Sequence, residues 1–446
     1  MSGQATRIQL TDFRTPPMRA FHLAWMSFFL CFLGWFGIAP LMAVVREDLA
    51  LTKAQIGNTI IASVAITVLA RLAIGPLCDR LGPRRTFAGL LVLGALPVMG
   101  IGLAHSYESF LLFRLAIGAI GASFVVTQYH TTKMFAPSCV GAANAAAAGW
   151  GNLGGGVAQI VMPLILAGIV TTFGLDARVA WRYTMIVPGV VMMLAGVAYY
   201  AFTQDSPEGD FGALRAAGRM APYGGSGGGG RFLEAARDPR VWALFVIYGA
   251  CFGIELTIDN VAALYLHDRF RLDVPTAGML AGLFGLMNLF ARALGGIVSD
   301  RVARGAGLVG RARFLFVVLF LEGVALTVFS QMGSVATAVA AMRTLGLFVK
   351  MSNGATYAVV PFVNATALGS VAGIVGAGGN VGAVLAGFLF RAEGMAPERA
   401  LAILGGVVMV ASVLALTLRF HGDRAEVPAT VSPEPLAACD DSVAIA

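Results

Sequence analysis

Residues 71–80 read RLAIGPLCDR, and residues 292–301 repeat the pattern as RALGGIVSDR. In each copy an arginine inside an apolar run precedes an Asp-Arg pair by eight residues, from Arg71 to Asp79 and from Arg292 to Asp300. The two copies are 221 residues apart, in opposite halves of the chain. This repeat indicates that the chain consists of two related halves, and it decides how the rest of the sequence is divided.

Two further pairs of segments support the duplication. Residues 148–154 read AGWGNLG and residues 376–382 read GAGGNVG, which places Asn152 and Asn380 at an offset of 228. Arg114 and Arg343, at an offset of 229, are each followed by a glycine. Duplicated halves are a recurrent plan of membrane transporters, whose binding sites lie near the membrane midplane between the halves.

The composition points to a chain that spends most of its length in lipid. Of its 446 residues, 58% are hydrophobic and 12% are charged, whereas soluble domains carry about 25% charged residues. Apolar runs of about 20 residues cross the hydrocarbon as helices, which satisfy their own backbone hydrogen bonds. The runs here are continuous and do not alternate, so we predict an all-α integral membrane protein.

We predict twelve transmembrane helices in two pseudo-symmetric six-helix halves, an arrangement that resembles the major facilitator fold. The domains are a cytoplasmic N-terminal segment, an N-terminal bundle, a Gly-rich cytoplasmic linker, a C-terminal bundle and a disordered cytoplasmic tail, at 1–20, 21–203, 204–239, 240–420 and 421–446. The predicted spans are 21–45, 56–78, 85–104, 109–135, 140–173, 180–203, 240–266, 274–300, 312–331, 334–360, 367–390 and 397–420. The fifth span is longer than a membrane crossing requires, so we expect it to extend beyond the lipid.

The loop charges predict the orientation. Of the 31 Lys and Arg residues, 18 fall on the side of the two termini, 8 on the opposite side and 5 within spans. Because basic loops stay in the cytoplasm, we expect both termini there, in a multi-pass protein of the cell inner membrane. This distribution also argues against nucleic acid as the reason for the net charge of +7.

The paired arginines carry the chemistry of the predicted site. Arg71 and Arg292 each lie about 12 Å along a helix from the cytoplasmic Asp-Arg pair, beyond snorkelling reach. Charges at that depth are costly and usually functional, although a structural ion pair is the alternative. Guanidinium groups offer a planar fork of donors that suits a small planar oxyanion. We expect such an anion to bind between the two halves.

The glycine-rich segments that contain the asparagines would complete this lining. Small residues in membrane helices usually serve close packing, which accounts for Gly151 and Gly379. We also expect these two glycines to lie at the interface of the halves and to let the backbone approach a small ligand, as part of the binding site. Packing does not account for Asn152 and Asn380, since an amide in lipid needs hydrogen-bond partners. The asparagines either brace the arginines or contact the ligand.

Here the sequence resembles a known family. Residues 148–156 (AGWGNLGGG) and 373–383 (GIVGAGGNVGA) look like the two nitrate signatures of the nitrate/nitrite porter family, and residues 252–260 (FGIELTIDN) are similar to its assimilatory high-affinity branch. The likeness covers essentially the whole membrane part. It implies secondary-active transport of nitrate by alternating access. Proton-coupled uptake is the leading expectation, and nitrate/nitrite exchange or nitrite export is the alternative.

The resemblance also implies roles in nitrate binding for single residues of this sequence. Arg71 and Arg292 match the paired nitrate-binding arginines of the family, and Tyr248 matches a tyrosine that contacts the ion. Phe124 and Phe252 match aromatic residues that wall the site above and below. For both rings ordinary apolar packing is the alternative, and for Phe124 the two interpretations weigh about equally.

Carboxylates on the span 240–266 are the candidates for proton coupling. Glu255 and Asp259 are four residues apart and share a helix face. Glu255 lies deep, so it is either a neutral acid or paired with an arginine; Asp259 is nearer the outer end, where water is the alternative partner. Arg114 is a third candidate, because transporters of this superfamily often link an arginine at this place to proton coupling.

The other intramembrane polar residues are less informative. Glu322 and Arg343 are candidates for a structural ion pair, Lys350 fits no family motif, and His130 is either a proton relay or a packing residue. The sequence has no nucleotide-binding loop, metal cluster or nucleophile constellation, so we expect no enzyme activity, cofactor or metal. We expect a monomer that takes nitrate, with nitrite as a second substrate, and protons, and is driven by ion gradients or exchange.

Overall fold

The computed structural model describes residues 3–136, 139–220, 228–364 and 368–420, and in these ranges the regular elements are all helices. The first half contains α1 (Pro16–Phe36), η1 (Ala39–Leu41), α2 (Met42–Asp48), α3 (Lys53–Leu81), α4 (Pro83–Gly100), η2 (Ile101–Leu103), α5 (Tyr107–Gly118), η3 (Ala119–Ala122), α6 (Ser123–Met134), α7 (Val140–Phe173), α8 (Ala177–Thr184) and α9 (Ile186–Phe202). The second half contains α12 (Pro239–Phe270), α13 (Val274–Leu286), η4 (Met287–Leu289), α14 (Ala291–Ser330), α15 (Val335–Val359), η5 (Val360–Phe362), α16 (Leu368–Arg391), α17 (Pro397–Ser412) and η6 (Val413–Thr417). The short helices α10 (Phe211–Ala216) and α11 (Gly228–Arg237) lie between the halves in sequence.

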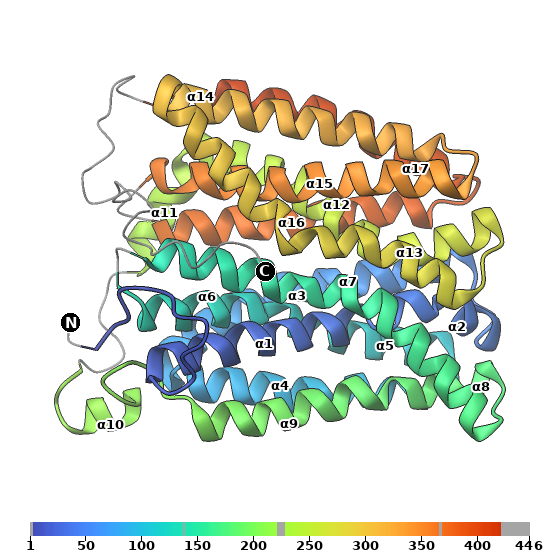
Figure 1. Ribbon diagram of the computed structural model, residues 1–446, viewed down its shortest axis with the longest axis horizontal. Helices are drawn as coiled ribbons and strands as arrows, with labels where there is room; N and C mark the ends of the chain where they lie inside the picture. Colours follow the sequence, from blue (N-terminus) through green and yellow to red (C-terminus); the bar gives the residue numbers. More distant parts are fainter. Residues whose placement is uncertain (1–2, 137–138, 221–227, 365–367, 421–446) are drawn as a thin grey trace.

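The described helices make twelve crossings, as the sequence predicts. Eleven helical stretches are long and apolar enough to cross a membrane, and one of them, Val274–Ser330, is 57 residues long. Inside it, Gly307 has φ 59° and ψ −152°, a conformation that favours glycine. Figure 1 shows α14 turning back near its label at the upper left, so the stretch forms the eighth and ninth crossings.

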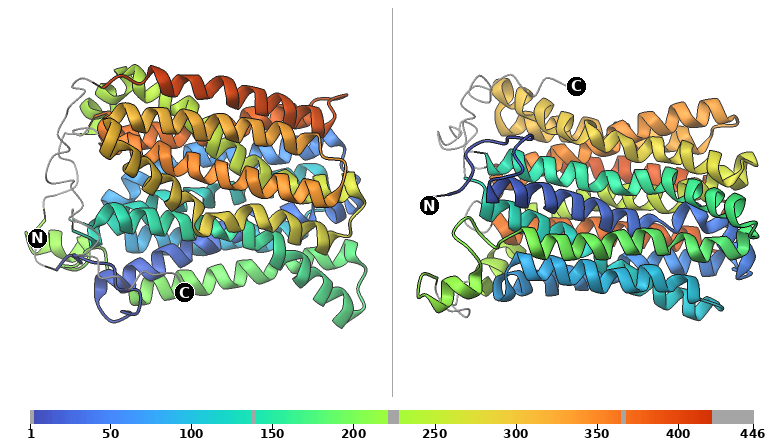
Figure 2. Two further views of the ribbon diagram at one scale, coloured as in Figure 1. Left: turned by 45° about the horizontal axis from the view of Figure 1, so that its top comes forward. Right: turned by 60° about the horizontal axis from the view of Figure 1, so that its bottom comes forward.

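The long helices run side by side in one bundle, which Figure 2 shows from two further directions. In Figure 1, α10 and α11 lie at one end of this bundle, called here the linker end, and α2 and α8 lie at the opposite end. The fifth crossing, α7, has 34 residues, about 51 Å of helix at 1.5 Å per residue. Its excess length agrees with the prediction that this span extends beyond the lipid.

Matching caps show the duplication at the level of local structure. Ser106 accepts a hydrogen bond from the backbone of Ser109 at the start of α5, and Ser334 accepts one from Thr337 at the start of α15. The two caps are 228 residues apart, the same offset as Asn152 and Asn380. Serine at this position satisfies a backbone N–H that the first turn of a helix leaves free.

The packing within each half supports the division into two bundles. The helices α1, α4, α7 and α9 pack together in the first half, and α12, α14, α15, α16 and α17 in the second. On this basis we propose the domain boundaries given above. Part of the Gly-rich run and the tail 421–446 lie outside the described residues, so the predictions for linker flexibility and tail disorder stay predictions.

The two halves meet through α3 with α16 and through α7 with α13. Glycine permits the closest approach, since a Cβ on Gly156 would lie 2.6 Å from the backbone of Gly285. At the opposite end, Arg46 forms an ion pair with Asp268 at 2.6 Å, and Lys53 donates to the backbone carbonyl of Ala392 at 3.0 Å. Within the described ranges, the polar contacts between the halves lie at this opposite end or near the middle of the bundle.

Candidate anion-binding site

Arg71 and Arg292 lie in the interior of the bundle, one in each half. Arg71, in the middle of α3, donates from Nη1 to the carbonyl of Gly376 on α16 at 3.1 Å. Arg292 follows the break in the eighth crossing at η4 and donates from Nη2 to the Tyr248 hydroxyl at 3.1 Å. In the described part of the chain neither guanidinium has a carboxylate within 4.0 Å, so the alternative of a structural ion pair finds no support.

Both guanidinium groups keep unused donors. Nε of Arg71 and Nη1 of Arg292 are buried and have no hydrogen-bond partner among the described residues. A buried donor without a partner costs free energy, and such groups in native proteins commonly receive a ligand or water. The geometry therefore leaves two cationic donors available to an anion.

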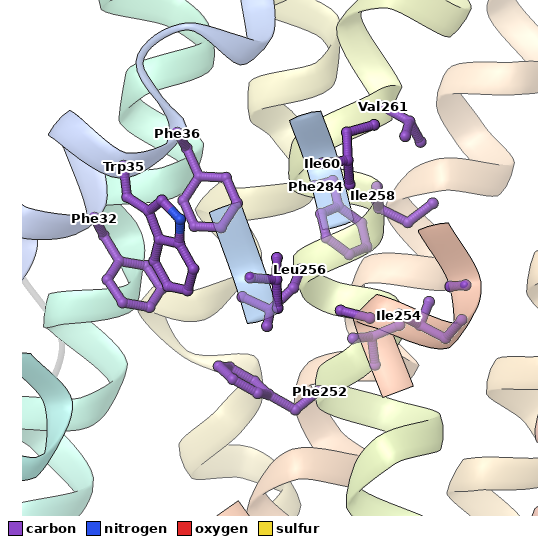
Figure 3. Packing of buried hydrophobic residues seen from close by; sticks show 14 of the residues in the cluster. Phe32, Trp35, Phe36, Ile60, Phe252, Ile254, Leu256, Ile258, Val261 and Phe284 are labelled. Carbon is purple, nitrogen blue, oxygen red and sulfur yellow. The ribbon is translucent and has the colours of Figure 1, made fainter. Parts of the chain in front are cut away.

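Each arginine also faces an aromatic ring. Arg71 lies over Phe124 of α6 at 5.5 Å from the ring centroid, and Arg292 lies over Phe252 of α12 at 5.9 Å. Tyr248 and Phe252 stack with centroids 5.1 Å apart and planes at 9°. In Figure 3 the Phe252 ring projects from α12 into the space between neighbouring helices. Phe124, Phe252 and Tyr248 are thus all placed next to the arginines that they were predicted to accompany.

Tyr357 of α15 is a neighbour of this group that sequence reasoning missed. Its ring meets Tyr248 edge to face with centroids 5.1 Å apart, and it lies close enough to interact electrostatically with both Arg71 and Arg292. A signal was present in the spacing, because Tyr357 follows Lys350 by seven residues and Asn353 by four. Residues at these intervals share one helix face.

Asn152 and Asn380 are both buried, at 1% and 0% exposure. Neither side-chain atom of either amide has a hydrogen-bond partner among the described residues. Unpaired buried amides are rare in native structures. They are candidates for contact with a ligand or with ordered water, and their assignment to the site stays a prediction.

The glycines of the same segments serve packing inside each half. A Cβ on Gly151 would lie 1.8 Å from Phe28 of α1, and one on Gly379 would lie 2.5 Å from Phe252 of α12. The prediction that Gly151 and Gly379 lie between the halves is therefore wrong, because the nearest neighbours of each belong to its own half. Among the described residues, the glycines that do meet the opposite half include Gly156 and Gly285, described above.

The contact of Gly379 with Phe252 predicts the effect of enlarging it. We expect Gly379→Leu to abolish transport, because the added side chain displaces Phe252 and Tyr248 from Arg292. Gly296→Leu on α14 is the matched control, since a Cβ there meets nothing within 4 Å. Uptake of labelled substrate by equal amounts of membrane-inserted protein measures the effect. Near-normal uptake by Gly379→Leu would show that these rings can move without loss of function.

Glu255 lies in a polar cluster next to this group. Lys350 of α15 contacts its Oε1 at 2.8 Å, and both side chains are buried, at 0% and 1% exposure. Asn288 donates to Oε1 at 3.0 Å, and Asn353 donates to Oε2 at 2.6 Å. The partner of Glu255 is therefore a lysine, whereas the sequence suggested either a neutral acid or an arginine pair.

The remaining coupling candidates are buried as well. Asp259 is 3% exposed, so water at the protein surface is not its partner. Arg114 is 1% exposed, and its guanidinium donates to Asn260 of the other half at 3.0 Å and to Ser63 at 3.2 Å. His130 contacts the carbonyl of Gln204 at 2.8 Å, which favours its packing role.

Two predictions about Arg343 are wrong. Arg343 is exposed on α15 and forms no ion pair with Glu322, which is fully buried. Its match with Arg114 also fails, because the caps of α5 and α15 are 228 residues apart, and that offset pairs Arg114 with Met342. One residue corresponds to about 100° around a helix, which turns Arg343 away from the interior.

The comparisons with known proteins agree with this architecture. Residues 24–387 match the model of the Major Facilitator Superfamily. A bacterial homologue of the human lysosomal transporter Spinster, in an inward-facing and occupied conformation, has a similar structure with a TM-score of 0.70 at 16% identity, over 93% of this chain and 99% of that one. The human organic anion transporter MFSD10 has a TM-score of 0.56 at 14% identity, over 90% of this chain and 100% of that one. These likenesses show the fold.

Relatives by sequence are more specific. High affinity nitrate transporter 2.5 of Arabidopsis thaliana is 39% identical over 93% of this chain and 82% of its own length. High-affinity nitrate transporter 2.3 of Oryza sativa is 40% identical over 87% of this chain and 74% of its own length. Nitrate/nitrite transporter NrtP of Picosynechococcus is 29% identical over 81% of this chain and 83% of its own length.

Fold and family together define a multi-pass membrane transporter and not an enzyme. Within the major facilitator superfamily, the chain belongs to the nitrate/nitrite porter family, with the high-affinity nitrate transporters among its relatives.

Proposed function

We propose that this protein takes up nitrate by proton-coupled, secondary-active transport with alternating access. The observation that carries the proposal is the pair of guanidinium groups from opposite halves, each with a buried donor that has no partner among the described residues. The names of the relatives support nitrate as the substrate, and the name of the cyanobacterial relative supports nitrite as a second one. Both termini would be cytoplasmic, in the inner membrane, and the transporter would act as a monomer.

Nitrate would bind between Arg71 and Arg292. It is planar and carries one negative charge, so the flat guanidinium fork matches its oxygens better than an ammonium group does. The Tyr248 hydroxyl, already held by Arg292, would donate to the same ion. The rings of Phe124 and Phe252 would exclude water, and a low local dielectric strengthens the attraction between the ion and the arginines.

Alternating access would use the contacts between the halves. The orientation from loop charges places the ion pair of Arg46 with Asp268 on the outer side, where the halves are in contact. The structure would then represent a state closed to the outside. Outward opening would separate this pair and also break the hydrogen bond from Arg71 to Gly376 across the halves.

Proton coupling would act through Glu255. In the state described here its carboxylate compensates Lys350, and it is also an electrostatic neighbour of Arg292. A proton on Glu255 would remove a negative charge beside Arg292 and so strengthen the attraction of that arginine for nitrate. Proton and anion would then bind cooperatively, because each favours the other.

The test uses purified protein in proteoliposomes with labelled nitrate. With an inward pH gradient and an empty lumen, we expect accumulation of nitrate; a lumen filled with nitrite tests exchange under the same conditions. Labelled sugars serve as the comparison for a general facilitator. Exchange without pH-driven accumulation would contradict symport and favour the nitrate/nitrite exchanger, while failure of both would contradict nitrate transport.

A further inference from the structure

A second buried carboxyl lies close to the pair of Glu255 and Lys350. Glu322 of α14 is 0% exposed, and neither of its carboxyl oxygens has a regular hydrogen bond among the described residues. Burial disfavours an ionised carboxylate without a partner much more strongly than a protonated, uncharged one. We therefore expect Glu322 to carry a proton in this state.

The neighbours of Glu322 come from two other helices. Ser352 and Lys350 approach it from α15, and Glu255 and Cys251 act on it from α12. The hydroxyl of Ser352 is itself buried and without a regular partner. Three buried acids, Glu255, Glu322 and Asp259, thus share one region with Lys350, and among them the lysine has an ion pair within 4.0 Å with Glu255 alone in the described part of the chain.

Lys350 has N–H donors that its ion pair with Glu255 leaves unused. An ammonium group carries three N–H donors, and Lys350 uses its charge on Glu255 at 2.8 Å without a hydrogen bond of regular geometry. The same ammonium lies 4.3 Å from the ring centroid of Phe284. The lysine is therefore placed to compensate a second carboxylate when the first becomes neutral.

From these contacts we propose that Glu322 is a second proton-carrying residue of transport and shares Lys350 as its counter-ion with Glu255. The inference rests on the proposed proton-coupled function and adds a residue to it. In the step, the O–H bond of Glu322 breaks and an O–H bond forms on Glu255, directly or through the Ser352 hydroxyl. The ammonium of Lys350 then turns from Glu255 to Glu322, and the total charge of the three residues does not change.

Charged neighbours connect this step to the anion. Glu255 is influenced by Arg292, which holds the proposed nitrate, and acts in turn on Asp259 of its own helix. When the proton reaches Glu255, the negative charge beside Arg292 is replaced by one on Glu322. Nitrate can then take over the compensation of Arg292.

The substitution Glu322→Gln tests this proposal, because glutamine resembles the protonated acid but cannot release a proton. In proteoliposomes we expect nitrate accumulation driven by pH to fall at least about tenfold, and exchange to fall much less. In infrared difference spectra we expect the variant to lose the carbonyl band of a protonated carboxyl group that the wild type shows. Glu322→Asp, which keeps a titratable group, should restore part of the accumulation.

Glu108→Gln is the matched control, because Glu108 is an exposed carboxylate at the start of α5, and it should behave as the wild type. Wild-type accumulation in Glu322→Gln, or an unchanged infrared band, would overturn the proposal. Equal loss of exchange and accumulation in both the Gln and the Asp variants would also overturn it, since it would mark Glu322 as structural. Failure of the wild type to move nitrate would instead refute the proposed function.

Discussion

Arg71→Lys and Arg292→Lys are each expected to abolish nearly all nitrate uptake. The positive charge is kept, but the planar pair of donors is lost. Arg292 donates from Nη2 to the Tyr248 hydroxyl and has Nη1 unused. The single ammonium nitrogen of a lysine cannot take both positions, so it would lose either the hydrogen bond to Tyr248 or the one to the anion. A charge-assisted hydrogen bond contributes about 1.5–3 kcal/mol, and each 1.4 kcal/mol is about a tenfold change in affinity.

Arg343→Lys is the matched control for this pair, because Arg343 is exposed on α15. It should retain wild-type uptake. The measurement is the initial rate of labelled nitrate uptake over a range of concentrations, at equal amounts of inserted protein. If either Arg71→Lys or Arg292→Lys transports nitrate with wild-type affinity, the two arginines do not form the binding site.

Glu255→Gln is expected to abolish nitrate accumulation driven by pH. An exchanger moves only when loaded, so exchange of nitrate should suffer much less than accumulation. The substitution also leaves Lys350 without its carboxylate, and breaking a buried ion pair in this way costs about 3–5 kcal/mol. Part of any loss in the single variant therefore reflects folding and not coupling.

The double substitution Glu255→Gln with Lys350→Gln separates these effects. It removes both charges of the pair, which should recover protein yield but not accumulation. Purified amount and thermal unfolding report folding, and proteoliposome uptake reports coupling. Accumulation of nitrate against its gradient by Glu255→Gln, driven by pH alone, would exclude Glu255 as the coupling residue and direct attention to Asp259 and Arg114.

The fold and the arginine pair were predictable because their signals are local or repeated. Apolar runs predict the crossings directly, and the copies at 71–80 and 292–301 indicate two equivalent positions. Most of the aromatic residues next to the arginines followed from the family resemblance. The structure places them as expected, apart from Tyr357, which no motif contains.

The ion pair of Glu255 with Lys350 could not be predicted in the same way. The two residues are 95 positions apart on different helices, and neither lies in a repeated segment. At the offset of 228 that relates the caps of α5 and α15, the counterpart of Lys350 is Ala122 in the first half. Only the packing of α12 against α15 brings the charges together, and such packing follows from tertiary structure.

The ion pair at the opposite end of the bundle has a consequence for the medium in which the protein works. Arg46 and Asp268 are 31% and 43% exposed, so dissolved salt screens their attraction, unlike that of the buried Glu255 and Lys350. Exposed ion pairs contribute about 0.2–1 kcal/mol. If the protein alternates between two access states as we propose, raising ionic strength should shift their balance by up to about fivefold, while leaving the buried pair unaffected.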